Sequence, residues 1–213
     1  MRHPPLVVAQ AMAATLLQFL RPANPNWRLV AVLFACLGSQ SKFAGADESA
    51  PLFSADGYRI AEFMAAVPQS VPGAVTVGTT AVRSLVEAGG AVLVDVLPAP
   101  SKPDGLPPTA LWMPLERRNI AGSAWLPNVG YGQLSEELED YFRGNLERLT
   151  GGSLDRKIVI YCLTDCWMSW NAARRAASYG YTAVYWYPEG TTGWEAAGLP
   201  LETGVPVPMD QSR

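Results

Sequence analysis

Residues 158–180 combine an apolar run, a loop with two cysteines and an alanine-rich segment, and they constrain the fold more than any other stretch. The run Ile158–Tyr161 predicts a buried strand, and the segment that ends at Gly180 has helix composition. Cys162 therefore stands at the carboxyl end of a strand, where the chain turns into a helix. Open α/β sheets place their chemistry at this edge, and the N–H groups of the next helix can stabilise a thiolate or an anion. The stretch predicts an α/β fold organised around a cysteine loop.

Strands and helices alternate on both sides of this loop. Short apolar runs predict strands, and segments with helical periodicity predict helices between them. The expected strands are 75–77, 91–96, 120–127 and 183–187, and the expected helices are 79–88, 135–150 and a short one near Trp194. This pattern predicts a single α/β domain, with a central parallel sheet and helices on both faces.

Local signals set the ends of several elements. Thr79 or Thr80 is the expected cap of the first helix, and its buried side is predicted from Ala81, Leu85 and Val86 or Ala88. Ser135 is the expected cap of the second helix, and Gly151 ends it. Six prolines between residues 98 and 114 predict an irregular loop.

The first 46 residues differ from the rest in charge. They hold four basic residues and no Asp or Glu, and an apolar run over 29–37 precedes the small-x-small sequence Ala44–Ala46. We expect a long secretory leader over 1–46, although an amphipathic or buried helix, or a lipoprotein signal at Cys36, fits the same segment. The apolar run is too short to span a bilayer as a stable helix. The expected organisation is then an N-terminal arm at 47–74, the domain at 75–204 and a loose tail at 205–213, in a periplasmic protein.

Removing the leader changes the chemistry that remains. Residues 47–213 keep 12 basic and all 19 acidic residues, a net charge of −7, which argues against nucleic acid or an anionic membrane as a partner. The only histidine, His3, lies in the leader, which excludes a Cys-His or Ser-His nucleophile pair and a His-ligated metal. Cys162, Cys166 and Asp165 give too few ligands for us to expect a metal site. A disulfide between the two cysteines fits an oxidising compartment.

The order of these motifs resembles that of the rhodanese-like domain. The resemblance covers about 75–204 and rests on the strand that ends in Asp95, on Ile120–Ala124, on the strand before Cys162 and on the segments around Gly180 and 189–200. It implies a nucleophilic cysteine at position 162. The sequence Cys162–Trp167 with Trp186–Gly190 is similar to exported rhodanese-like proteins that carry a Cys-x-x-x-Cys-Trp motif and are associated with pyrroloquinoline-quinone-dependent alcohol catabolism.

The chain also departs from this family. Leu97 replaces the usual Arg after Asp95, and Asn119 replaces the usual His before Ile120. No Arg or Lys lies between Cys162 and Asn171, where rhodaneses often hold a sulfur donor with a cation. Met168 or Ser169 takes the place of the Arg that the related phosphatases and arsenate reductases need, so we do not expect those activities.

The candidate catalytic residues are Cys162, Cys166 and Asp165. Cys162 is the expected nucleophile, with an inert buried cysteine as the alternative. Cys166 either resolves a sulfenic acid or persulfide on Cys162 or forms a structural disulfide with it. Asp165 either serves as a general base or caps a turn. The expected substrate-binding residues are Leu163, Thr164, Trp167, Met168, Ser169, Trp170, Arg174 and Asp95.

Three functions compete for this sequence. The first is an enzyme that transfers sulfur through a persulfide on Cys162, or exchanges dithiol for disulfide with Cys166, with a sulfur donor or a thiol/disulfide partner. The second is a periplasmic binding module, in which Trp167, Trp170, Trp186 and Trp194 line a flat pocket for a quinone-like redox cofactor or contact a partner dehydrogenase. The third is a structural domain with a permanent disulfide.

Overall fold

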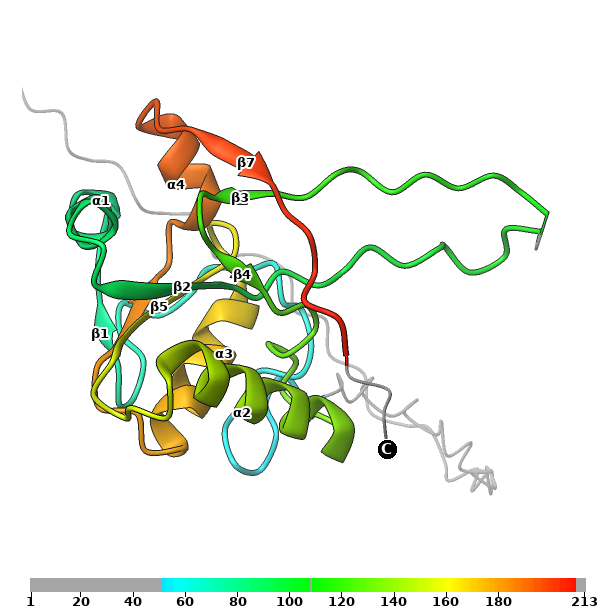
Figure 1. Cartoon of the computed structure of the whole chain (residues 1–213). Coiled ribbons are helices and arrows are strands. Elements are labelled where there is room, and N and C mark those ends of the chain that lie inside the picture. The colour runs from blue at the N-terminus through cyan, green and yellow to red at the C-terminus, as the bar shows by residue number, and fades with distance from the viewer. Residues whose placement is uncertain (1–50, 108, 210–213) are drawn as a thin grey trace, which may run out of the picture. The chain divides into compact units, whose positions relative to one another are not determined.

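A five-stranded parallel sheet forms the centre of the residues that the computed structural model describes, 51–107 and 109–209 (Figure 1). The leader expected over 1–46, with Cys36, lies outside these ranges. The strands follow one another across the sheet in the order β1 (Val75–Thr76), β6 (Val184–Tyr187), β5 (Lys157–Tyr161), β2 (Ala91–Asp95) and β4 (Ala124–Trp125). The predicted parallel sheet is confirmed, and β5, the strand that leads to Cys162, lies at its centre.

Helices cover both faces of this sheet, as predicted. α2 (Glu136–Thr150) and α3 (Trp167–Ser178) pack on one face, and α1 (Thr79–Glu87) and α4 (Gly190–Ala196) on the other (Figure 1). Side chains alternate along β5, so Ile158 and Ile160 face α2 and α3, while Val159 and Tyr161 face the opposite way. Each fully buried aliphatic side chain contributes about 1.5–3 kcal/mol of burial free energy.

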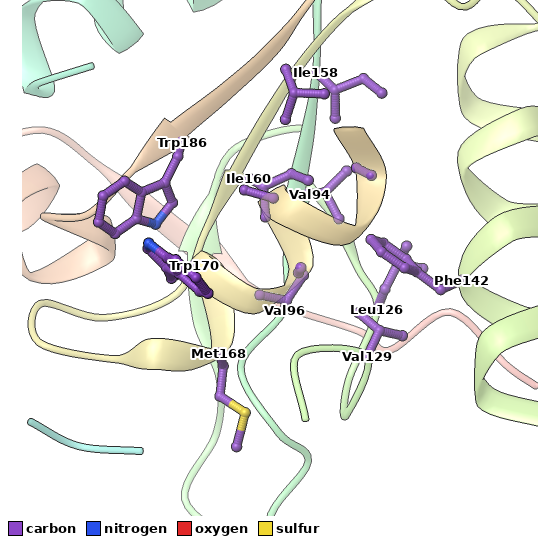
Figure 2. Packing of buried hydrophobic residues seen from close by; sticks show 14 of the residues in the cluster. Val94, Val96, Leu126, Val129, Phe142, Ile158, Ile160, Met168, Trp170 and Trp186 are labelled. Carbon is purple, nitrogen blue, oxygen red and sulfur yellow. The ribbon is translucent and has the colours of Figure 1, made fainter. Parts of the chain in front are cut away.

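The larger core cluster lies between the sheet and the pair α2 and α3. Figure 2 shows Val94 and Ile160 from the sheet beside Phe142 of α2, with Trp186 of β6 close to Trp170 of α3. Ala172, Ala173 and Ala176 of α3 are fully buried, because their small side chains let this helix approach the sheet closely. The core therefore fixes α3, and with it the cysteine loop that precedes α3.

The predicted ends of α2 are confirmed. The Ser135 hydroxyl accepts a hydrogen bond from the N–H of Leu138 at 3.3 Å, and Gly151 ends the helix with a φ of 64°. The cap predicted for α1 is wrong. Gly78 is its N-cap residue, and the carboxylate of Glu189 accepts hydrogen bonds from the N–H and the hydroxyl of Thr79. The carboxylate of Glu189, which is distant in sequence, thus stabilises the start of α1, where a Thr79 or Thr80 side chain was the expected cap.

The predicted buried face of α1 is wrong by about one position. Val82 is fully buried, Leu85 and Val86 are half-buried, and Ala81 and Ala88 are exposed. Alanine gains little from burial, so the larger Val82 determines which side of the helix faces the sheet.

The proline-rich loop and the N-terminal arm lack regular structure, and two further strands form a second, smaller sheet. The proline-rich segment between β2 and β3 (Arg118–Ile120) is an irregular loop in its described residues, as predicted, and it projects from the domain (Figure 1). β3 pairs antiparallel with β7 (Leu201–Thr203) in a two-stranded sheet that was not predicted. The arm over 58–63 has no regular structure: Arg59 pairs with Phe53 as an isolated antiparallel bridge, and Glu62 has a φ of 49°.

The expectation of a loose tail does not hold for 205–209. The N–H of Val207 donates to the carbonyl of Trp125 at 2.9 Å, and the Tyr141 hydroxyl donates to the carbonyl of Val207 at 2.6 Å. Val207 and Met209 also pack against the core. No helix of the described residues is long and apolar enough to cross a membrane.

Candidate functional site: a buried cysteine pair

Cys162 follows β5 directly and is completely buried. Its thiol points to two carbonyl oxygens, those of Leu163 at 3.7 Å and Cys166 at 3.5 Å. Its own carbonyl accepts a hydrogen bond from the N–H of Thr191, at 3.0 Å, at the start of α4. A carbonyl oxygen near a sulfur favours the protonated thiol, so this position disfavours a thiolate.

Cys166 is the N-cap residue of α3, with extended backbone angles, and is 2% exposed. Its side chain makes no capping hydrogen bond with the N–H groups of the first turn of α3. Residue Asp165, with a φ of 55°, makes the turn that brings Cys166 back towards Cys162. The second cysteine thus occupies the helix terminus, a position where N–H groups stabilise a thiolate.

The two thiols differ in acidity for these reasons. Burial raises the pKa of Cys162 well above that of an ordinary thiol, and the adjacent Cys166 adds to this effect. The pKa of Cys166 is lowered, chiefly because the Cys162 thiol donates a hydrogen bond to it, with the N–H groups of the loop and of α3 in support. Burial opposes this lowering. The Cys166 thiol is therefore the more acidic of the two.

Asp95 lies on the opposite face of the sheet from the two thiols. It is fully buried, and its carboxylate accepts hydrogen bonds from Arg117 Nε at 2.6 Å and from the N–H of Leu97 at 3.0 Å. Burial raises its pKa, and the Arg117 guanidinium acts in the opposite direction. The Asp95 carboxylate is thus paired with Arg117, and its predicted role in substrate binding stays a prediction.

Arg117 is the residue that the sequence analysis missed. Besides Asp95, its guanidinium donates to the carbonyl of Cys162 at 3.3 Å and to the hydroxyl of Thr191 at 3.2 Å. The chain thus supplies a cation beneath the cysteine loop from the end of the proline-rich loop. The one available signal was an aspartate in a buried apolar strand, which requires a cationic partner.

Several α3 residues, among them Trp167, Trp170 and Arg174 from the predicted substrate-binding set, contact the N-terminal arm. The side-chain amide of Asn171 accepts from the N–H of Arg59 at 3.0 Å and donates to its carbonyl at 2.9 Å. Trp170 Nε1 donates to the carbonyl of Ser70 at 3.0 Å, and Arg174 donates to the carbonyls of residues 56 and 57. The ring of Trp167 packs under the Arg59 guanidinium, 5.0 Å from the ring centre. Nothing in the sequence indicated this role of Asn171 except that it is a polar residue in an alanine-rich helix.

The same arm covers the cysteine loop through its backbone. The N–H of Ala65 donates to the carbonyl of Asp165 at 2.9 Å, and the N–H of Trp167 donates to the carbonyl of Phe63 at 2.8 Å. Met64 pairs with Cys166 as an antiparallel bridge. Residues 63–65 therefore lie across the loop beside the second cysteine.

The four tryptophans do not line one flat pocket. Trp167, Trp170 and Trp186 belong to the core on the α2 and α3 face, and Trp194 to the core on the other face. All four are buried. Trp186 Nε1 donates to the Ser169 hydroxyl at 3.0 Å, and Ser169 donates to the carbonyl of Cys166 at 3.2 Å, so this tryptophan supports the loop from within.

The remaining predicted residues lie around the loop with different exposure. Asp165 and Thr164 are exposed, Leu163 is half-buried and Met168 is buried. The Thr164 hydroxyl donates to the carbonyl of Glu189 at 2.8 Å, which ties the loop to α4. Asp165 has a φ of 55° at the turn of the loop, and its predicted role as a general base stays a prediction.

A cleft of about 380 Å³ adjoins the other side of the loop. It lies between the proline-rich loop, α4 and Leu163, and its lining includes Arg117, Trp125 and Thr191. Neither cysteine lines this cleft. In the described part of the chain, no cluster of three or more His, Cys, Asp or Glu side chains could hold a metal ion.

The fold and the site define an α/β protein with a two-cysteine loop after its central strand. The family model for the rhodanese-like domain matches residues 78–197, so the chain belongs to this family. The predicted family is thereby confirmed, whereas the narrower group with the Cys-x-x-x-Cys-Trp motif stays a prediction. No curated protein matched the chain significantly.

Several solved structures are similar to this chain. Thiosulfate sulfurtransferase from Pseudomonas aeruginosa is 16% identical with a TM-score of 0.43, and the match covers 62% of this chain but only 21% of that protein. The polysulfide-sulfur transferase homodimer from Wolinella succinogenes is 18% identical with a TM-score of 0.40, covering 61% and 79%. The rhodanese-like domain of the Anabaena Alr3790 protein is 20% identical with a TM-score of 0.42, covering 65% and 89%.

Proposed function

We propose that the protein performs thiol chemistry with Cys162 and Cys166, by reversible exchange between the dithiol and an internal disulfide. The observation that carries this proposal is the presence of two free, buried cysteines in one loop, with the Cys162 sulfur 3.5 Å from the carbonyl oxygen of Cys166. A dithiol in this arrangement can reduce a partner's disulfide and keep the oxidised product as its own disulfide.

The test is equilibration of the full chain with buffers of reduced and oxidised glutathione. We expect the loss of two hydrogen atoms by mass spectrometry, and a single midpoint potential in the range of known exchange catalysts, about −270 to −120 mV. Cys162→Ser and Cys166→Ser are the controls, since neither can form the internal disulfide. A pair that stays reduced or stays oxidised over the whole range would contradict exchange, and a midpoint below about −300 mV would favour a structural disulfide.

Sulfur transfer through a persulfide on Cys162 is the second candidate function. It is supported by membership of the rhodanese-like family and by the place of Cys162 after the central strand. The full chain incubated with thiosulfate should then gain one sulfur atom on Cys162 and pass it to cyanide. An unchanged mass at Cys162 would remove this candidate and leave disulfide exchange untouched.

We also propose that the protein is exported and acts in the periplasm, next to a pyrroloquinoline-quinone-dependent alcohol dehydrogenase. This is supported by the leader-like composition of residues 1–46 and by the resemblance of Cys162–Trp167 to the exported Cys-x-x-x-Cys-Trp group. Protein recovered from its own compartment should begin at Asp47. Recovery of an uncut chain would contradict export by a cleaved signal.

A further inference from the structure

Residues 60–68 of the arm form a strap that is anchored at both ends. On one side of the strap, the N–H and the carbonyl of Arg59 are bonded to the side-chain amide of Asn171. On the other side, the carbonyl of Ser70 accepts a hydrogen bond from Trp170 Nε1. Both partners belong to α3, so one helix holds the two anchors while the strap between them crosses the cysteine loop.

The strap lies on the domain in the way that a β-strand with one buried face does. Phe63, Ala65 and Val67 are half-buried and pack against the core, and the ring centre of Phe63 lies 5.4 Å from that of Tyr131. The residues on either side of each of these are exposed, namely Glu62, Met64, Ala66 and Pro68. This period of two is that of an extended chain. The surface under the strap therefore accepts side chains at alternate positions of an extended chain.

Main-chain hydrogen bonds hold the middle of the strap. The carbonyl of Asp165 and the N–H of Trp167 bond to the main chain of residues 63–65 at 2.9 Å and 2.8 Å. Met64 lies opposite Cys166 between these two bonds, as in a non-hydrogen-bonded pair of an antiparallel ladder. Such bonds do not depend on side chains, so another extended chain in the same register can form them.

Two features weigh against the closed arrangement. Glu62 has a φ of 49°, a left-handed conformation that residues other than glycine rarely adopt. Trp167, whose main chain binds the strap, has a buried indole N–H without a hydrogen-bond partner in the described part of the chain. A buried donor without an acceptor costs free energy. A polypeptide that replaces the strap brings carbonyl oxygens, the acceptors that this donor lacks.

We infer that the surface under the strap is a binding site for an extended polypeptide segment of the redox partner, and that the strap is its internal competitor. The inference rests on the proposed dithiol–disulfide exchange and names its substrate class. Both thiols are buried, and the strap crosses the loop that holds them. A polypeptide can replace the main-chain bonds and the alternate side-chain contacts that the strap gives up, whereas a small disulfide cannot.

The strap also indicates which sequence fits the site. Its inward residues are an aromatic, a small and a branched apolar residue, at alternate positions. Glu62 precedes them and pairs with Arg59 at 3.4 Å. The preferred segment is therefore an acidic residue followed by apolar residues at every second position. In this register one residue of the partner lies opposite Cys166, where Met64 lies in the closed protein, which brings a partner's disulfide to the cysteine pair.

The first experiment measures hydrogen exchange of the wild-type full chain by NMR. The N–H of Ala65, in the middle of the strap, should exchange at least about tenfold faster than the N–H of Arg59 at its anchor, because the strap opens locally. Equal rates at the two positions would overturn the inference, since the arm would then open only as a whole. No substitution is involved, so misfolding of a variant cannot affect this result.

The second experiment measures, by fluorescence anisotropy, the binding of a labelled peptide with the strap's own sequence, residues 61–68. This peptide has no cysteine, so its binding is independent of thiol chemistry. Phe63→Ser weakens the strap and should raise the affinity for the peptide at least about tenfold, because the site is open in a larger fraction of molecules. Met64→Ser is the matched control, since Met64 is 62% exposed, and it should bind the peptide as the wild type does.

A second peptide, with Asp in place of its Phe and its Val, tests the alternate positions. It should bind the Phe63→Ser variant at least about tenfold more weakly, because two buried apolar side chains are lost. Equal binding of the two peptides, or equal affinities of Phe63→Ser and the wild type, would overturn the inference. Peptide binding without dithiol exchange in glutathione buffers would refute the proposed function and leave the binding site, whereas exchange without peptide binding would refute the site.

Discussion

The Asp95–Arg117 ion pair ties two distant parts of the chain to the cysteine loop. Asp95 ends a central strand, and Arg117 ends the proline-rich loop, yet their side chains meet at 2.6 Å in the interior. The same guanidinium reaches the carbonyl of Cys162. Removing one member of a buried pair leaves the other charge without compensation, which costs more than the pair itself contributes.

Arg117→Met should therefore destabilise the protein by about 3–5 kcal/mol, measured by urea denaturation at pH 7. Without the cation, the pKa of Asp95 in the folded state rises further above its unfolded value, because burial already raises it. The folded variant then binds more protons than the unfolded chain, so its free energy of unfolding increases as the pH falls through the folded pKa.

Arg118→Met is the matched control, because Arg118 is exposed and its ion pair with Glu195 spans 3.9 Å. It should change the stability by less than about 1 kcal/mol. The double variant Asp95→Asn with Arg117→Met should recover part of the lost stability. Equal effects of Arg117→Met and Arg118→Met would show that the buried pair has no special role.

The acidity of Cys166 gives a second prediction at this scale. Its pKa is lowered in the folded protein, so the rate of iodoacetamide modification of Cys166 should rise and level off at lower pH than in the urea-unfolded chain. In Cys162→Ala the midpoint should move up, because the leading cause of the lowered pKa is the hydrogen bond from Cys162. Superimposable pH profiles for the folded and unfolded wild type would contradict the stabilised thiolate.

The sequence located the reactive loop but not the roles within it. Cys162 could be placed from the apolar run before it, because a strand end is a local property. The place of Cys166 at the start of α3 depends on the turn at Asp165, and the contact of Arg117 depends on how a long loop returns to the sheet. Neither arrangement is encoded in residue spacing.

At the scale of elements, α3 connects the cysteine loop to the N-terminal arm. Its buried alanines face the sheet, while Asn171 and Trp170 bind the arm on another side of the helix. Asn171 joins three segments, because its amide also donates to the carbonyl of Gly130 at 2.9 Å. One helix therefore positions Cys166 at its N-terminus and fastens the segment that covers it.

Asn171→Leu should release the arm at little cost in side-chain volume. The N–H and carbonyl of Arg59 would lose their partners, which costs about 1–3 kcal/mol for each buried unsatisfied group. We expect faster hydrogen exchange over 59–65 and faster iodoacetamide modification of Cys166.

Ser178→Ala is the control for this prediction, since Ser178 lies on the same helix and its hydroxyl donates only to the carbonyl of Arg175. It should leave both rates unchanged. If the Asn171→Leu variant loses stability but its Cys166 still reacts with iodoacetamide at the wild-type rate, the arm does not limit access to this thiol.

The caps of α1 and α2 show which hydrogen bonds can be predicted from the sequence. The Ser135 cap of α2 was predictable because serine and the N–H that it binds are three residues apart. The cap of α1 was not, because Glu189 lies 110 residues away from Thr79 and comes close only when β6 pairs with β1. Local hydrogen bonds can be inferred from spacing, whereas those made by tertiary structure cannot.

At the scale of the whole molecule, the alternation of strands and helices was sufficient to predict the parallel sheet and its two covered faces. The tail was not predictable, because its Val-Pro-Val-Pro-Met sequence over 205–209 does not indicate which elements it contacts. It is held by hydrogen bonds to Trp125 and Tyr141, and by the small sheet between β3 and β7. Such contacts become visible only when the elements that supply their partners are in place.

The stability of the whole domain should depend on the redox state of the cysteine pair in a pH-dependent way. In the reduced protein the folded pKa of Cys166 lies below its unfolded value, so folding releases protons there, and the reduced form gains stability as the pH rises through the folded pKa towards about 8.5. This contribution is lost again as the pH falls through the folded pKa. In the oxidised protein neither Cys162 nor Cys166 has a thiol to titrate. The free energy of unfolding of the reduced form, minus that of the oxidised form, should therefore increase over this pH window.

The titration of Cys162 reverses this pH dependence of the stability at higher pH. Its folded pKa is raised well above that of an unfolded thiol, so above about pH 8.5 the unfolded chain loses the Cys162 proton first and the reduced form loses stability. Urea denaturation of both redox forms between pH 5 and pH 10 should therefore show a difference that rises, passes through a maximum and falls. A difference that is constant over this range would show that neither thiol is perturbed in the folded state, and one that only falls would remove the stabilised thiolate at Cys166.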